Sequence, residues 1–529
     1  MYCRGTRGGI SLAAFIYGAL VLMAASFFNR LLGFLYQVWI IRILGPEGIG
    51  LFNIAYPIYV LALVLASAGI PVAIAKLTAE EVARDNLRGA YRVFYVAFAC
   101  IVVMALLTTA VTVVALPFIS TFVFPNPRAR LCFASLIPGI LIVALCSAFR
   151  GFFQGLQQMA PTAVTQSLEQ VVRVAAGLGL ACLWLPRGLE YATMGAALGV
   201  VLGELAGFAV MLGIFFRHRP AVPRRPSRPA PAPRLQIGRR IFGLAVPVTL
   251  TRFAACAFMS VDAVLIPSRL QAAGLSQAEA TAAYGQLVGM AETLVFTPSL
   301  ITISLATALV PAVAEAHATR DRALLHRLMG QALRVTVLTG LPCAAVLFLL
   351  PRELCAALFG YPEAGAILGI LALGGPFLYY QQTSTGILQG LGYAGRPLRN
   401  LVVASLFKTV GVYYVAALPQ WHILGTAAVT AGHHLVVALL NSADLRLLTG
   451  FRPDPGQYLL KPLLATAGMV PVLWEGYRHV YLATHSNALA LAVALPLGAL
   501  AYALLLFLTG AVDRRDLARL RDLWGLWAR

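Results

Sequence analysis

The chain has 529 residues, of which 60% are hydrophobic and 11% are charged, and its mean hydropathy is +0.82. Apolar stretches about 20 residues long recur along it, which is the length an α-helix needs to cross a bilayer. These stretches are continuous and lack the alternation of a transmembrane β-barrel. The composition therefore excludes a soluble domain and predicts an all-α polytopic membrane protein.

The net charge of +20 does not indicate nucleic-acid binding. Most of the lysines and arginines lie at the two ends of the chain and in loops on the same side as the N-terminus. Such an asymmetry is typical of the cytoplasmic loops of membrane proteins. We therefore expect a multi-pass membrane protein with both termini in the cytoplasm, no large basic domain and no nucleic-acid partner.

The apolar pattern divides into fourteen predicted spans, which are separated by loops. We place them at residues 11–44, 48–75, 93–117, 130–149, 162–185, 192–216, 241–267, 281–313, 329–350, 365–391, 400–418, 423–445, 458–476 and 487–511.

The loop at residues 217–240 is rich in proline and arginine and predicts a basic cytoplasmic linker. It separates an N-terminal six-helix lobe (1–216) from a C-terminal six-helix lobe (241–450), and two further transmembrane helices follow (451–512). The tail at 513–529 places leucines and tryptophans on one helical face and arginines opposite. This pattern predicts a helix on the cytoplasmic surface of anionic lipid.

A short phrase occurs twice in the chain. Gly151–Leu156 and Gly386–Leu391 both read Gly-x-x-Gln-Gly-Leu, and each ends a predicted span. Pro71 and Pro311 mark a second correspondence, near the ends of the second and eighth spans. We infer two parallel six-helix repeats, which in transporters hold substrate between them and rock to give alternating access.

Arg30 lies deep in the unusually long first span, too far from either end to reach water comfortably. Two interpretations are open. Arg30 can line a cavity and contact an anion, or it can be the structural partner of a buried acid.

Other predicted spans also carry charges. Glu169 and Arg173 are spaced i,i+4 and can pair. The remaining charges are Glu204, Arg252, Asp262, Glu292 and Lys408. Buried cations suit a phosphate-bearing substrate, because arginine offers a planar fork to phosphate oxygens, whereas buried acids suit proton or sodium coupling or a cationic drug.

No motif for a cofactor, a metal or catalysis stands out. The eight cysteines are scattered, and no phosphate-binding glycine loop or catalytic triad spacing is present. We expect no cofactor and no enzymatic activity.

Three stretches together resemble the stage V sporulation protein B family of the multidrug/oligosaccharidyl-lipid/polysaccharide exporter superfamily, at residues 29–81, 150–174 and 284–316. The resemblance implies a lipid-linked oligosaccharide flippase of the bacterial cytoplasmic membrane, related to the MurJ lipid II flippases and serving spore-cortex peptidoglycan. Arg30 falls where MurJ-like flippases keep a cavity arginine. Tyr36 and Gln37 stand where those proteins have an Arg-Asp pair, and Glu292 lies near the position of another cavity arginine.

The sequence thus predicts export of a lipid-linked, pyrophosphate-bearing glycan. The predicted substrate contacts are Arg30, Arg173, Arg252 and Lys408, and the predicted coupling or charge-balancing acids are Glu169, Asp262 and Glu292. Na⁺ and H⁺ are the candidate coupling ions. A multidrug antiporter of the MATE type and a non-transporting scaffold for glycan synthesis are the alternatives.

Overall fold

The structure is a computed structural model, and it describes residues 12–67, 69–218, 233–452 and 456–512, with side chains from residue 25 onward. The tail at 513–529 and most of the predicted linker, residues 219–232, lie outside the described residues.

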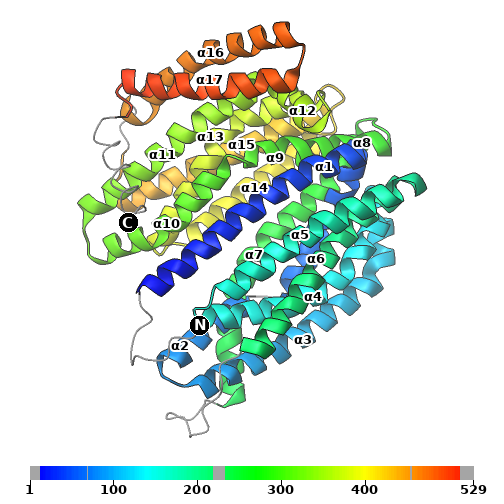
Figure 1. The fold of residues 1–529 in the computed structure, drawn as a ribbon, viewed down its shortest axis with the longest axis vertical. Coiled ribbons are helices and arrows are strands. Elements are labelled where there is room, and N and C mark those ends of the chain that lie inside the picture. Colours follow the sequence, from blue (N-terminus) through cyan, green and yellow to red (C-terminus); the bar gives the residue numbers. More distant parts are fainter. Residues whose placement is uncertain (1–11, 68, 219–232, 453–455, 513–529) are drawn as a thin grey trace. The chain divides into compact units, whose positions relative to one another are not determined.

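The described chain is built from helices (Figure 1). They are α1 (Leu12–Ser67), α2 (Ile70–Ala83), α3 (Leu87–Phe118), η1 (Ile119–Val123), α4 (Ala129–Gly155), α5 (Ala160–Trp184), η2 (Leu185–Arg187), α6 (Leu189–His218), α7 (Arg234–Ala272), α8 (Gln277–Tyr284), η3 (Gly285–Glu292), α9 (Thr293–Phe296), α10 (Ser299–Ala318), α11 (Arg322–Leu349), α12 (Pro351–Phe359), α13 (Ala364–Gly390), α14 (Gly395–Val415), α15 (His422–Thr449), η4 (Gly456–Leu460), α16 (Lys461–Thr484) and α17 (Asn487–Leu508).

The first two predicted spans meet at a sharp kink. Gly45 has φ 67° and ψ −178°, a conformation that glycine adopts readily and that breaks α1 into two helices. The predicted second span, 48–75, is not one helix, because α1 ends at Ser67 and α2 begins at Ile70. The predicted eighth span, 281–313, is also divided, since a π-helix and the short α9 come before α10.

Eleven helical segments of the described chain are long and apolar enough to cross a membrane. One of them, at 25–83, covers the second predicted span and residues 25–44 of the first, and α14 and α16, at the eleventh and thirteenth predicted spans, are not among the eleven. The polytopic helical prediction is confirmed, but the count of fourteen spans is not.

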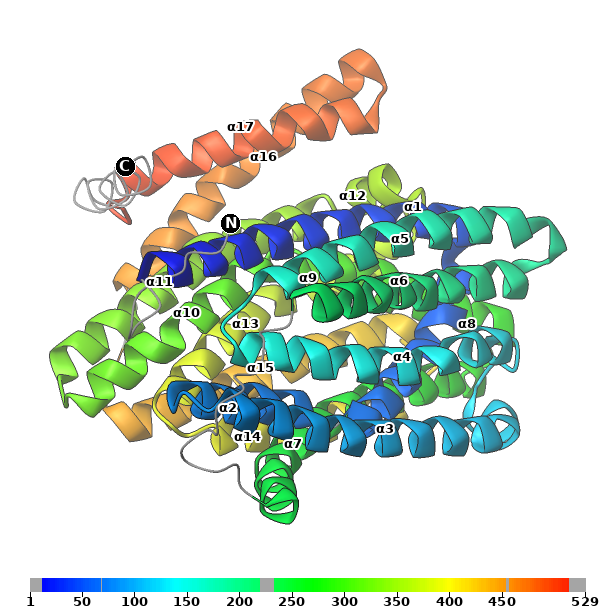
Figure 2. The same ribbon diagram turned by 60° about the horizontal axis from the view of Figure 1, so that its bottom comes forward.

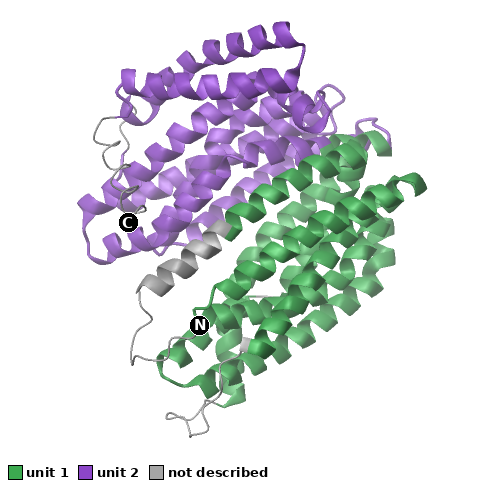
Figure 3. Ribbon diagram, viewed as in Figure 1, with its two compact units in different colours: residues 1–267, 277–285 green, residues 268–276, 286–529 purple. Residues whose placement is uncertain are grey.

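By compactness the chain forms two units (Figure 3). Unit 1 comprises residues 1–267 and 277–285, and unit 2 comprises 268–276 and 286–529. The boundary falls inside α7 rather than at the linker, so α7 up to Pro267 belongs with the first unit. The lobe boundaries drawn from the sequence stay a prediction about the repeat.

The two units repeat the same succession of helix ends. A difference of 235 residue numbers separates Ala129 from Ala364 and Gly155 from Gly390, the first and last residues of α4 and α13. The same difference separates the first residues of α3 and α11. Their N-caps correspond too, because Asn86 and Asp321 each accept a hydrogen bond at 2.9 Å from the backbone N–H three residues ahead.

The repeated phrase forms the same corner in both units. Gln157 (φ 59°) and Gly392 (φ 84°) take the left-handed conformation at equivalent positions. In each corner, the N–H of the next residue donates to the carbonyl oxygen five residues earlier, at 2.9 Å in unit 1 and 3.0 Å in unit 2. This is a Schellman closure of a helix end, so the phrase encodes a helix stop and a turn.

The glycines of the phrase allow one helix to lie directly against another. A Cβ on Gly151 would be 2.6 Å from the carbonyl oxygen of Pro71, and a Cβ on Gly386 would be 2.7 Å from that of Ala306. Pro71 therefore corresponds to Ala306, and its predicted correspondence to Pro311 is wrong by five residues. The proline is easy to see in the sequence, but the contact made by the glycine shows which residues of the two units correspond.

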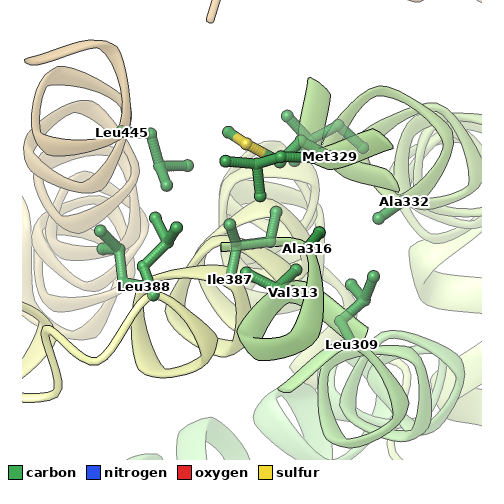
Figure 4. Packing of buried hydrophobic residues seen from close by; sticks show 11 residues of the cluster. Leu309, Val313, Ala316, Met329, Ala332, Ile387, Leu388 and Leu445 are labelled. Atoms are coloured by element: carbon green, nitrogen blue, oxygen red, sulfur yellow. The ribbon is translucent and has the colours of Figure 1, made fainter. Parts of the chain in front are cut away.

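The core of unit 2 gathers around this corner (Figure 4). Ile387 and Leu388, which belong to the phrase, pack with residues of α10, α11 and α15. The labelled members of this cluster are Leu309, Val313, Ala316, Met329, Ala332, Ile387, Leu388 and Leu445. α16 and α17 pair with each other as the last hairpin of unit 2 (Figure 2).

The close approach at Gly151 predicts opposite effects for two glycine-to-alanine changes. Gly151→Ala should destabilise the fold by about 1–3 kcal/mol, because the new methyl group meets backbone atoms. Gly179→Ala, in α5 with nothing within 4 Å of its Cβ, should stabilise by up to about 1 kcal/mol. Thermal unfolding of the two purified variants checks this, and a loss at both sites or at neither would contradict it.

Candidate functional site

Four charged side chains of unit 1 form a connected network. Arg150 Nη2 on α4 lies 2.6 Å from Glu169 Oε2 on α5. Arg173 Nη2, one turn further along α5, lies 3.0 Å from Glu169 Oε1 and 3.0 Å from Glu204 Oε1 on α6. Two arginines and two glutamates thus neutralise one another across three helices that run side by side (Figures 1 and 2).

The glutamates of the network are buried, with Glu169 9% and Glu204 8% exposed, and its arginines are half-buried. An isolated charge in such a place is costly, whereas a paired and hydrogen-bonded one is tolerated. The pairing of Glu169 with Arg173 was predicted, and the structure adds Arg150 and Glu204. The parts played by Arg150 and Glu204 could not be predicted from sequence spacing, because these two residues lie on other helices.

A row of glycines brings α6 against α5 at the network. Gly195, Gly199, Gly203 and Gly207 recur every fourth residue and lie on one face of α6. A Cβ on Gly203 would lie 2.6 Å from the carbonyl oxygen of Glu169. The glycine spacing was a readable signal for this packing, and it places Glu204 within reach of Arg173.

Tyr36 on α1 lies at the edge of the same region. A Cβ on Gly177, one turn beyond Arg173 on α5, would be 2.7 Å from the Tyr36 hydroxyl. Tyr36 stands where MurJ-like proteins are expected to carry an arginine. In this chain the position therefore holds an aromatic side chain that packs against α5.

Arg30 and Arg252, two predicted substrate contacts of unit 1, are exposed on α1 and α7. Within the described part of the chain, neither forms an ion pair or a side-chain hydrogen bond. The interpretation of Arg30 as the partner of a buried acid is therefore not supported by any described acid.

The remaining predicted site residues, Asp262, Glu292 and Lys408, are half-buried, and each takes part in an interaction. Lys408 lies near His434. It is also the repeat counterpart of Arg173, since 235 residue numbers separate them. Ala404 stands at the position that corresponds to Glu169, so the network of unit 1 is not repeated in unit 2.

Unit 2 has a different polar network, which the sequence analysis missed. The carboxylate of Asp444 on α15 accepts hydrogen bonds from Arg396, Arg399 and Asn400 near the start of α14. Asn400 also donates to Asn441, 2.9 Å away. Among the described residues, no group of three or more His, Cys, Asp or Glu side chains is placed to hold a metal ion.

Comparison with known proteins bears on this arrangement. The model of the polysaccharide biosynthesis protein family matches residues 15–317, and the MatE model matches 268–414. Stage V sporulation protein B of Bacillus subtilis (strain 168) is 32% identical over 435 residues, which are 82% of this chain and 83% of that protein. The chain belongs to the stage V sporulation protein B family.

More distant relatives place this family member among transporters. The lipid II flippase MurJ of Bacillus subtilis (strain 168) is 22% identical, over 74% of this chain and 76% of that protein. A solved structure of lipid II flippase MurJ, in an inward closed conformation, is similar with a TM-score of 0.69 at 16% identity, over 94% of this chain and 100% of that one. An inward-facing MATE family multidrug transporter of the MOP superfamily gives 0.65 at 15% identity, over 82% and 98%.

These likenesses identify the fold as MurJ- and MATE-like and the chain as a membrane flippase or transporter of the MOP type. MurJ and the MATE family transporter are transport proteins, which is consistent with a chain that is not an enzyme.

The network of this family member predicts a specific rescue. Arg173→Leu leaves Glu204 buried without its arginine and should cost about 3–5 kcal/mol of stability. Adding Glu204→Leu should restore much of that loss, because the Arg150–Glu169 pair remains balanced. Unfolding of the purified variants and their abundance in membranes measure both effects, with Arg30→Leu as a matched control that should lose little.

A double variant less stable than Arg173→Leu alone would contradict the charge-balancing role of Glu204.

Proposed function

We propose that the chain is an alternating-access flippase that moves a lipid-linked, pyrophosphate-bearing oligosaccharide from the inner to the outer leaflet. The names of the relatives support a glycan precursor of peptidoglycan, since one is a sporulation protein and another is a lipid II flippase. We further propose that the glycan serves the spore cortex and that both termini lie in the cytoplasm.

The main support for the proposal is which charged residues of unit 1 are paired and which are not. The glutamates of the network, Glu169 and Glu204, already have arginine partners. Arg30 and Arg252 lie on helices long and apolar enough to span a membrane, and no described acid pairs with them. Unpaired cations on such helices suit an anionic substrate better than a cationic drug.

This pattern divides the roles of the charged residues. We propose that Arg30 and Arg252 contact the pyrophosphate, because a guanidinium can donate two parallel hydrogen bonds to phosphate oxygens. Arg173 and Glu169 balance each other and keep α4, α5 and α6 together. Lys408 is proposed as a further anion contact in unit 2, and Asp262 and Glu292 as groups that balance charge or couple transport to Na⁺ or H⁺.

An ion-coupled antiporter of the MATE type is the second candidate. The MatE match over residues 268–414 favours it, because that stretch contains the acid Glu292. The paired state of Glu169 and Glu204 argues against it, since a cationic drug needs an available acid. The third alternative, a non-transporting scaffold, would gain little from charges placed inside spanning helices.

Substitution of Arg30 tests the headgroup contact. Arg30→Ala should lower transport by about tenfold or more, as expected for the loss of charge-assisted hydrogen bonds, at normal abundance and melting temperature. Transport by Arg30→Lys should lie between that of Arg30→Ala and that of the unchanged chain, because the point charge of lysine replaces the planar guanidinium group. The measurement is complementation of a flippase-deficient strain, with membrane abundance followed in parallel.

Arg187→Ala, in the exposed turn η2, is the matched control and should complement fully. Full complementation by Arg30→Ala at normal abundance would remove the headgroup role and favour the antiporter.

A further inference from the structure

Unit 2 has a cavity that the proposed transport function does not use. Its volume is about 590 Å³, and it lies where the turn between α10 and α11 meets the end of α15. Three basic side chains line it: His317, Arg320 and Arg322. Its remaining lining is largely apolar and comes from Ala316, Leu325, Leu447 and Leu448, together with Asp321, Thr449 and Gly450.

The basic side chains of this cavity are not engaged by the other described residues and can contact a ligand. All three are exposed, and within the described residues none of them forms an ion pair or a side-chain hydrogen bond. The one acid of the lining, Asp321, is engaged as the N-cap of α11, where it accepts a hydrogen bond from the backbone N–H of Leu324 at 2.9 Å. The cavity is therefore cationic.

The repeat indicates that these basic residues are not needed to form the turn. In unit 1 the equivalent turn has Asp85, Asn86 and Leu87 where unit 2 has Arg320, Asp321 and Arg322. The backbones agree, since Asp85 has φ 55° and Arg320 has φ 56°.

The left-handed conformation favours Asn, Asp and Gly over arginine. Arginine at position 320 therefore does not favour the backbone conformation of the turn. Its role is assigned to its side chain instead.

We propose that this cavity binds a phosphate-bearing molecule. Two guanidinium groups and an imidazole provide donors for phosphate oxygens, and the leucines provide a surface for an apolar part of the ligand. The volume lies in the range of small-molecule pockets, roughly 300–1,000 Å³, and exceeds what a bare phosphate ion needs. The phosphate can belong to a membrane lipid headgroup or to a soluble compound.

Calorimetric titration of the purified full-length chain in neutral detergent tests the site with two probes. Dioctanoyl phosphatidic acid represents the lipid source, and inorganic pyrophosphate represents the soluble source. All titrations use the Arg30→Ala/Arg252→Ala background, so that the proposed substrate contacts do not contribute and the two proposals can fail separately.

Arg320→Asn/Arg322→Gln removes both guanidinium groups, and asparagine keeps the left-handed turn. We expect at least one probe to bind the background protein and its affinity to fall about tenfold or more in this variant. Arg478→Gln, which removes an exposed arginine outside the cavity, is the matched control and should leave the affinity unchanged.

Binding of the lipid, of pyrophosphate or of both, weakened by the loss of Arg320 and Arg322, would support the site and identify the source of the phosphate. The proposal is overturned if neither probe binds, or if affinity is the same with and without Arg320 and Arg322 at an unchanged melting temperature. The arginines would then act only as the positive charges of a loop.

Discussion

The buried ion network of unit 1 is the interaction on which the rest of the account depends. The hydrocarbon core of a membrane does not solvate charge, so a charged side chain in a spanning helix needs a partner or a polar cavity. Arg150, Glu169, Arg173 and Glu204 meet this requirement within three helices. Because the network is neutral, it adds no net charge to the unit. In unit 1, the charges that we propose for contact with the substrate are those of Arg30 and Arg252.

The network in turn depends on backbone contact. Glu204 reaches Arg173 because the glycines of α6 let its backbone lie against α5, and the phrase glycines do the same for α4 and α2. Side chains any larger at these positions would separate the helices and leave the charges apart. Small residues and polar residues therefore act together, as is common between helices in membranes.

The two units share backbone features while their side chains differ. Both ends of α4 and α13, the first residues and N-caps of α3 and α11, and the Schellman corner coincide in the two units at a constant difference in numbering. The chemistry does not coincide: the position of Arg173 carries Lys408 in unit 2, and the position of Asp85 carries Arg320. Each unit thus offers a different set of charges on a similar backbone, and an anion site is proposed in each.

The sequence predicts what is local in this structure and misses what depends on contacts between helices. The apolar runs, the i,i+4 pair Glu169–Arg173 and the repeated phrase are local patterns, and each corresponds to a feature of the fold.

Arg150 and Glu204 were not assigned to the network, and Asp444 was missed, because their partners come from neighbouring helices. The alignment of Pro71 with Pro311 was wrong for the same reason. The contact between the glycine of the repeated phrase and the neighbouring helix, and not the proline, shows which residues of the two units correspond.

Transport by the purified chain in vesicles tests the central claim most directly. A polyprenyl-pyrophosphate glycan lipid placed in one leaflet is followed by its exposure to a membrane-impermeant reagent, in parallel with efflux of a cationic dye. The account predicts that the chain speeds transfer of the glycan lipid over protein-free vesicles and does not move the dye. Dye efflux driven by an ion gradient, with no transfer of the glycan lipid, would contradict it.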